Sequence, residues 1–174
     1  AAVTMRAVIR DAQLSPRYFY ESFPDRADLL VAVFDVALQQ LQERVTAAMV
    51  EASTDPVMQT RAAFSAVASV FEHDPRIARI MLREALAEAA LRDHAYAALS
   101  LFISTTSLNL LDESWYRQTD PVMLRLDISA LAGTSLSVFL DWTEGRLDIT
   151  QQQLVDYLTD TVDGMVRRRL NSTR

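Results

Sequence analysis

The chain has 174 residues, half of them hydrophobic, and a formal net charge of −6. It contains no cysteine, which excludes a disulfide framework and any thiolate metal site and is typical of a cytoplasmic protein. No run approaches the ~18 apolar residues of a membrane span and no signal peptide is visible, so we expect a cytoplasmic protein without a membrane partner. This length allows one domain, or a small domain joined to a larger one.

The beginning of the chain predicts two short helices separated by a tight turn. An apolar stripe at helical spacing marks the first helix, at Met5, Val8, Ile9 and Ala12. Ser15 suits the N-cap of the second helix, because its hydroxyl can accept a hydrogen bond from a free helix N–H. Phe19 and Phe23 share one face of that helix and can pack on the stripe. Two short helices on a tight turn are typical of a helix-turn-helix, whose second helix lies in the DNA major groove.

The opposite face of the second helix carries an arginine beside two tyrosines, with a serine nearby. Its members are Arg17, Tyr18, Tyr20 and Ser22. Such a face suits DNA, because arginine can bond guanine bidentately and a tyrosine hydroxyl can reach a phosphate. The alternative is a small helical hairpin with solvated tyrosines, and periodicity alone leaves both interpretations open.

The order and spacing of these N-terminal residues are specific. They run Thr4, Ile9, Ala12, Ser15, then Tyr18-Phe19-Tyr20, Phe23-Pro24, Arg26 and Leu29-Leu30. This pattern resembles the N-terminal signature of the TetR family of bacterial transcriptional repressors. The resemblance implies an all-α protein: a helix-turn-helix DNA-binding domain at residues 1–30 and a larger helical domain at residues 31–174 that binds an effector and dimerises.

The resemblance also implies roles for individual residues. Thr4 would begin the motif near the DNA backbone, and Arg6 lies where some members of the family read a base. Arg17 and Tyr18 occupy the variable positions that set sequence preference. Tyr20 and Arg26 match residues that contact the phosphate backbone. Ser15 and Ser22 complete the predicted DNA-binding set.

Two departures from the family pattern stand out. Gln13 replaces the turn glycine, so a residue with a Cβ is expected at positive φ, at a cost near ~1 kcal/mol. The family's usual first helix has no counterpart in this sequence, so we expect the natural protein to have residues upstream. Residues 1–26 carry four Arg against three acids, whereas the rest carries 13 Arg against 20 acids. A near-neutral N-terminus on an acidic body permits phosphate contact and disfavours nonspecific binding.

Asp-Pro pairs divide the rest of the chain. Asp55-Pro56, Asp74-Pro75 and Asp120-Pro121 each place an N-cap acid before a proline at the first helical position. Thr150 and Gln153 form a capping box, and Gly145 suits a helix C-terminus. No alternating pattern predicts a strand. We expect helices at 4–12, 16–23, 26–52, 56–72, 75–90, 94–117, 121–144 and 151–170.

The last two helices are the candidate dimer interface. Apolar and small residues recur on them at helical spacing, and the predicted interface comprises Leu124, Ile128, Leu131, Ser135, Phe139, Leu154, Leu158, Val162 and Met165. The sequence alone favours an intrachain core for these residues. The family resemblance reverses that preference, because TetR-like proteins pair these helices with their symmetry mates in a four-helix bundle.

A ligand cavity between the body helices is predicted from mixed apolar and polar residues. Its candidate residues are Phe71, Met81, Phe102, Asn109 and Trp115. Apolar walls with a few polar groups are typical of small-molecule sites, although such residues more often form plain core. No cofactor or metal site is expected, because His73 and His94 belong to no Glu-x-x-His pair. The absence of a Gly-rich phosphate loop and of a serine elbow motif also argues against an enzyme.

These observations predict a ligand-responsive transcriptional regulator, a repressor in the simplest case. Its partners would be double-stranded operator DNA, a second copy of itself and an unidentified small-molecule effector. The alternative is a helical small-molecule-binding or protein-interaction module without competent DNA binding.

Overall fold

The protein is described by a computed structural model that covers residues 5–110 and 120–172. All regular structure in these residues is helical, which confirms the predicted all-α class. The elements are α1 (Met5–Asp11), α2 (Pro16–Ser22), α3 (Arg26–Ala52), α4 (Pro56–His73), α5 (Pro75–Ala78), the π-helix η1 (Arg79–Glu84), α6 (Ala85–Ala87), α7 (Ala89–Leu110), α9 (Pro121–Thr143) and α10 (Gln151–Ser172). α3 has the predicted bounds and is roughly 40 Å long at 1.5 Å per residue.

Aspartate caps start the long helices, as the sequence predicted. Asp55 accepts a hydrogen bond from the Val57 N–H, and Asp120 accepts from the N–H groups of the first helical turn that follows it. The Thr150 N–H donates to Gln153 Oε1 at 2.9 Å, which confirms the capping box. Ser15 differs: it occupies the N-cap of α2, but its hydroxyl makes no capping hydrogen bond. These local signals place most helix starts within a residue or two of their predicted positions.

Residues 75–90 do not form the single helix that the sequence predicted. The chain passes from α5 through η1 to α6, breaks at Glu88 (φ −103°, ψ 120°), and α7 then starts at Ala89 rather than near His94. Three consecutive η1 residues are buried: Ile80, Met81 and Leu82. A straight amphipathic α-helix cannot bury three neighbours in a row, whereas the wider π-turn can rotate them into the core.

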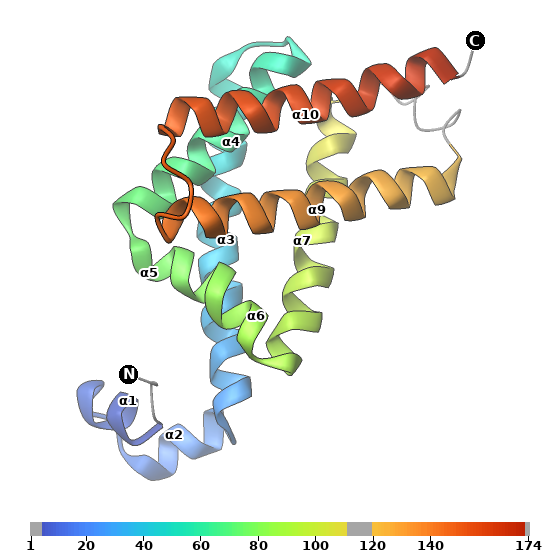
Figure 1. Ribbon diagram of the computed structural model, residues 1–174. Coiled ribbons are helices and arrows are strands. Elements are labelled where there is room, and N and C mark those ends of the chain that lie inside the picture. The colour runs from blue at the N-terminus through green and yellow to red at the C-terminus, as the bar shows by residue number, and fades with distance from the viewer. Residues whose placement is uncertain (1–4, 111–119, 173–174) are drawn as a thin grey trace.

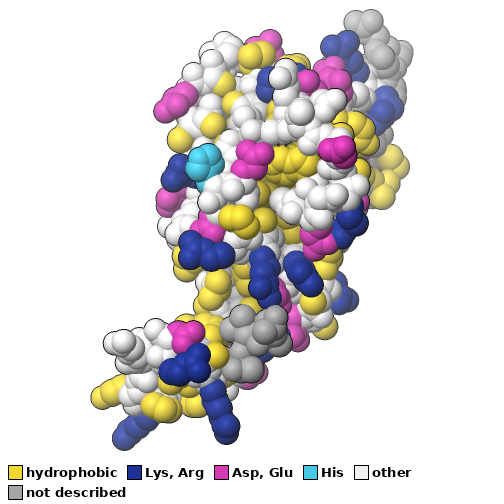
Figure 2. Space-filling model, turned by 60° about the vertical axis from the view of Figure 1, so that its left-hand side comes forward, with side chains coloured by type: hydrophobic (Ala, Val, Ile, Leu, Met, Phe, Trp, Pro, Cys, Tyr) yellow, Lys and Arg dark blue, Asp and Glu magenta, His cyan; other side chains and the backbone are white. Residues whose placement is uncertain are grey.

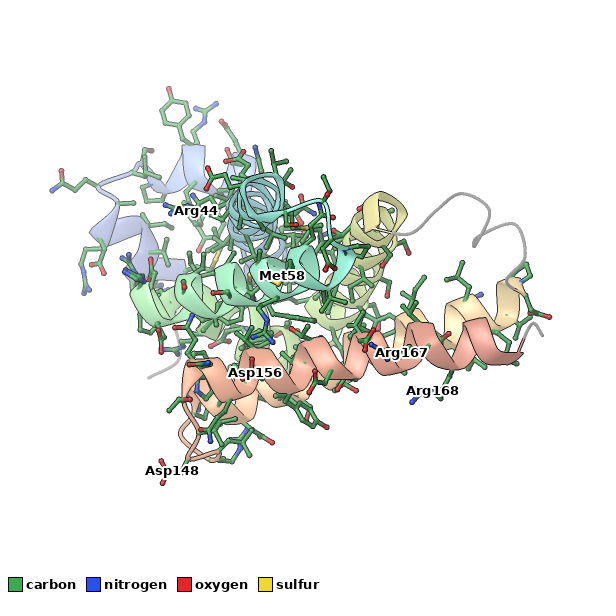
Figure 3. All side chains as sticks on the ribbon, turned by 90° about the horizontal axis from the view of Figure 1, so that it is seen from above. Arg44, Met58, Asp148, Asp156, Arg167 and Arg168 are labelled. Carbon is green, nitrogen blue, oxygen red and sulfur yellow. The ribbon has the colours of Figure 1, made fainter. Side chains whose placement is uncertain are left out.

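The helices form a body around α3, with α1 and α2 projecting together from its N-terminal end (Figure 1). α4 packs along α3, and α10 packs on α4. The ion pair between Arg61 and Asp156 joins the last two of these helices, and Figure 3 shows Asp156 on the side of α10 that faces α4. The body core contains the buried residues Phe34, Leu41, Val45, Phe71, Leu91, Phe139, Leu154 and Leu158.

α9 and α10 lie side by side, and their far ends extend past the other helices (Figures 1 and 3). α9 has a mean hydropathy of 1.4 over an 18-residue window, of which only 17% is buried. By length and composition alone it could cross a membrane, which is weak evidence and was not anticipated from the sequence. The same hydropathy and low burial also fit an apolar helix that is largely exposed to solvent in a single copy of the chain.

Candidate functional site

The tight turn between α1 and α2 adopts the strained backbone that the sequence predicted. Gln13 has φ +55°, in the left-handed region that residues with a Cβ rarely adopt. The Leu14 N–H donates to the Ile9 carbonyl at 3.1 Å across this turn. Phe19 is only 3% exposed, and its ring lies 5.4 Å from that of Phe23. Phe19 is therefore the enclosed side chain of α2, and the ring of the C-cap residue Phe23 lies beside it.

The outward face of α2 consists of the residues predicted for DNA contact. Tyr18 is 70% exposed and Tyr20 is 46% exposed. Arg17 is also exposed, with its Nε 3.0 Å from Glu21 Oε1 on the next helical turn. Arg6, Ser15 and Ser22 are exposed as well, while Thr4 lies outside the described residues. Figure 2 shows arginine side chains extending from this end of the molecule into solvent.

Arg26, the predicted phosphate contact at the start of α3, is held by the body. Its Nη1 lies 3.0 Å from Glu88 Oε2 and its Nη2 lies 3.2 Å from Glu84 Oε2. Glu84 Oε1 also accepts from Arg79 Nε at 3.3 Å. Both carboxylates belong to the segment that interrupts the predicted helix, at the end of η1 and at the break before α7. The base of the N-terminal helix pair is thus tied by charge to η1 and α6.

A cavity of about 330 Å³ lies between α3, α4, η1, α7 and α9. Phe71, Met81 and Phe102, three of the five predicted ligand residues, all line it. The side chain of Asn109 and the whole of Trp115 lie outside what the structure describes. Further lining residues come from α3 (Phe34, Leu38, Leu41), α7 (Arg92, Ala95, Tyr96, Leu99, Ile103) and α9 (Ala132, Gly133, Ser135, Leu136, Phe139).

The sequence did not identify the α3 and α9 residues as cavity lining. Phe34 and Leu41 appear in the sequence as an apolar stripe, and such a stripe has the same form whether it meets a neighbouring helix or an empty space. Ser135, predicted for the dimer interface, is also among the residues that line this cavity.

Three residues of the predicted dimer interface belong to the core of the chain itself. Leu154 and Leu158 are 0% exposed, and Phe139 is 3% exposed and packs edge-to-face on Phe71. A fully enclosed side chain cannot contact a second copy, so these three assignments are corrected. The half-exposed residues of the predicted set are Leu124, Ile128, Leu131, Ser135, Val162 and Met165.

Both histidines are engaged at helix surfaces. His94 Nε2 lies 2.6 Å from Asp35 Oδ1 and links α7 to α3, while His73 Nδ1 lies 2.9 Å from the Ser69 carbonyl one turn earlier. Within the described residues, no group of three His, Cys, Asp or Glu side chains is arranged to hold a metal ion.

Comparisons of the chain with protein-family models, curated proteins and solved structures found no match. The resemblance of residues 4–30 to the TetR family therefore rests on the residues of that segment alone.

Proposed function

We propose that the protein is a ligand-responsive transcriptional regulator whose α1–α2 pair binds operator DNA. The observation that carries this proposal is the division of α2 into two faces. Phe19 is buried, whereas Arg17, Tyr18 and Tyr20 on the same short helix are exposed. Exposed tyrosines beside an arginine are unusual on a surface that contacts only solvent. They suit contacts to phosphates and base edges.

The proposal includes a dimer formed through the projecting ends of α9 and α10. Val122 and Leu126 on α9 are exposed large apolar residues, and a second copy of the chain would cover them. A twofold dimer presents two recognition helices to half-sites about 34 Å apart, or a multiple of that distance.

The body cavity is the effector site in this proposal. An effector changes DNA affinity only through its difference in affinity between the DNA-bound and free conformations. The Arg26 ion pairs supply a physical connection, because Glu84 and Glu88 flank a segment that lines the cavity.

A second candidate function is a ligand-binding module without DNA binding. The observation that favours it is the engagement of Arg26 with two body carboxylates, which occupies the cation expected to hold a phosphate. In this alternative the protein binds a small molecule in the cavity, and the outward face of α2 does not bind nucleic acid.

Selection from a random pool of double-stranded oligonucleotides, followed by fluorescence anisotropy, distinguishes the two functions. The regulator requires saturable, sequence-preferring binding that weakens steeply between about 50 and 200 mM salt. Binding no tighter than to scrambled DNA at every salt concentration contradicts it.

Single substitutions then identify the surface. Loss of one base or phosphate contact costs about 1–3 kcal/mol, so Arg17→Ala or Tyr20→Ala is expected to weaken operator binding at least ~5-fold with the fold intact. Arg44→Ala is the matched control, because Arg44 is an exposed arginine on α3 and lies eighteen residues, or roughly 27 Å, along that helix from Arg26, its first residue. Equal effects of Arg17→Ala and Arg44→Ala would remove α2 from the interface.

A further inference from the structure

The body cavity has an apolar interior and a charged mouth. Phe34, Phe71, Met81 and Phe139 form part of its buried wall. The lining residues that are exposed are Leu86, Arg92, Tyr96 and Gly133, and they mark where the cavity reaches solvent. Over residues 5–110 and 120–172, no aspartate or glutamate lines it.

The cavity is elongated along α7. Arg92, Ala95, Tyr96, Leu99 and Ile103 all line it and lie on one face of that helix. Eleven residues separate the first from the last, which corresponds to roughly 16 Å at 1.5 Å per residue. Its volume of about 330 Å³ is roughly twice the ~150 Å³ cavity that holds benzene. The space therefore fits a molecule longer than one ring, with its length parallel to α7.

Arg92 is the cation at the mouth, and only part of its guanidinium is used. Its Nε and Nη2 donate to the Leu86 carbonyl at 3.3 and 2.9 Å, at the break between α6 and α7. A guanidinium has five N–H donors, and the others of Arg92 meet no partner among the described residues. The Tyr96 hydroxyl, one turn along α7, also has no hydrogen-bond partner in the described part of the chain and is open to solvent.

We propose that the cavity binds an amphiphile with an elongated apolar body and one acidic head group, and that Arg92 receives the head group. The inference rests on the proposed role of this cavity as a ligand site. The head group stays at the solvent-exposed mouth, so it keeps much of its hydration while the body displaces water from the apolar interior. A cationic head group at the same mouth would be repelled by the like charge of Arg92 and meets no carboxylate from the described lining.

Three ten-carbon probes with different head groups test the ligand class. Decanoate, 1-decanol and decyltrimethylammonium are used to displace N-phenyl-1-naphthylamine, a neutral fluorophore that brightens in apolar sites. We expect decanoate to displace it at about fivefold lower concentration than decanol, the gain of an exposed charge-assisted contact. Decyltrimethylammonium is expected to be the weakest of the three. Equal potency of decanoate and decanol, or preference for the cation, overturns the acidic head group.

Substitutions at the mouth assign the head-group contact to one residue. Arg92→Gln is expected to remove the preference for decanoate over decanol and to leave decanol unchanged, while Arg92→Lys keeps part of the preference. Arg125→Gln is the matched control, because Arg125 is exposed on α9 and does not line the cavity. A decanoate preference that survives Arg92→Gln overturns the role of Arg92.

Substitutions within the cavity locate the apolar body of the ligand. Leu99→Trp fills the cavity from α7 and is expected to weaken fluorophore binding at least tenfold. Leu101→Trp is the control two residues away, at a side chain that is 65% exposed and outside the cavity. Ala95→Leu and Ala97→Leu repeat this comparison with a smaller change if Leu99→Trp unfolds, since Ala95 lines the cavity and Ala97 is exposed. Fluorophore binding that is unaffected by Leu99→Trp and Ala95→Leu overturns the proposal.

These measurements contain no DNA. The proposed ligand class and the proposed regulatory function can therefore be contradicted independently of each other. Decanoate that binds through Arg92 in a protein without operator affinity leaves the ligand class standing and contradicts the regulator. Operator binding combined with no probe binding contradicts the ligand class alone.

Discussion

At the scale of single residues, the backbone at Gln13 carries the clearest local strain. The turn between α1 and α2 requires φ +55° there, and the Cβ of glutamine crowds the backbone in that conformation. Gly145, by contrast, meets a φ of +71° at the end of α9 without that penalty. A positive φ is therefore adopted by a glycine at the end of α9, but by a glutamine at the turn between α1 and α2.

Gln13→Gly is expected to stabilise the α1–α2 pair by about 1 kcal/mol, because glycine adopts positive φ without steric cost. The measurement is amide hydrogen exchange of α1 and α2. Gln40→Gly is the matched control: Gln40 is exposed in the middle of α3, where glycine should destabilise by about 1 kcal/mol. If Gln13→Gly destabilised the protein as Gln40→Gly does, the assignment of strain to Gln13 would be contradicted.

Asp74 gives a pH-dependent prediction at the same scale. Its hydrogen bonds from the Arg76 side chain, at 2.8 and 2.7 Å, hold the pKa of Asp74 below its ordinary value of 3.8. A lowered folded-state pKa means that this carboxylate stabilises the fold above about pH 4 and that the contribution is lost as pH falls through the folded value. Arg76→Gln should raise the pKa of Asp74 toward 3.8, as measured by NMR titration of the side-chain carboxyl. Arg125→Gln should leave it unchanged, and an unchanged pKa in Arg76→Gln would show that Arg76 does not lower the pKa of Asp74.

At the scale of elements, the interrupted helix between residues 75 and 90 connects the two functional regions. Residues of η1 and α6 line one side of the cavity. The same segment contains Glu84 and ends at Glu88, the two carboxylates that bind Arg26. Met81 of η1 lines the cavity, and Glu84 at the end of the same π-turn contacts Arg26 at the start of α3.

A double-mutant cycle measures this connection. Arg26→Ala combined with Glu84→Gln is expected to give a coupling energy of about 0.5–1 kcal/mol in urea unfolding, the upper part of the range for partly exposed ion pairs. The same cycle for Arg17 and Glu21, an exposed pair within α2, should give about 0.3 kcal/mol. Coupling at Arg26 no larger than at Arg17 would show that the Arg26 ion pair stabilises the fold no more than an exposed pair within one helix does.

The same ion pairs bear on DNA binding if the regulator proposal holds. Glu84→Gln with Glu88→Gln releases Arg26, so operator affinity should rise and the salt slope should steepen by about one phosphate contact. Anisotropy titrations at several salt concentrations provide the measurement, with Glu43→Gln, an exposed acid on α3, as the control. Unchanged affinity in the double variant would remove Arg26 from the DNA contacts.

At the scale of the whole molecule, α9 carries the surface through which we propose that two copies associate. Its buried residues, Ala132 and Phe139, attach it to the core, while Val122 and Leu126 face solvent near its projecting end. Exposed apolar residues on a projecting helix favour an interaction site, and we propose a second copy of the chain as its occupant.

Leu126→Glu tests the proposed dimer at this surface. Leu126 is 54% exposed, so the fold should tolerate the charge. Two copies that face each other across a twofold axis would then juxtapose like charges, at a cost of several kcal/mol and about a hundredfold in dimer affinity. Sedimentation equilibrium gives the association constant, and Val50→Glu, on exposed α3 surface, is the control. A monomeric unsubstituted protein would contradict the dimer, and co-sedimentation with lipid vesicles would assign this surface to a membrane.

Local chemistry in the sequence was sufficient for most helix starts and for the division of α2 into two faces, but not for the interrupted segment between residues 75 and 90. Asp55, Asp120 and the Thr150–Gln153 box act within one turn of their own helix, so their effect does not depend on the rest of the fold. The positive φ of Gln13 was expected for a different reason, because Gln13 stands where the family pattern that residues 4–30 resemble has a turn glycine.

Tertiary packing alone decided which apolar faces meet and which surround a space. Leu154 and Leu158 have the spacing of an interface but are enclosed by their own chain, whereas Phe34 has the spacing of a core residue and also lines a cavity. Likewise, no proline or glycine marks the break at Glu88, and no local signal pairs Arg26 with carboxylates about sixty residues away. Apolar periodicity indicates which face of a helix is turned away from solvent. Which helix or cavity that face meets is determined by how the helices pack together.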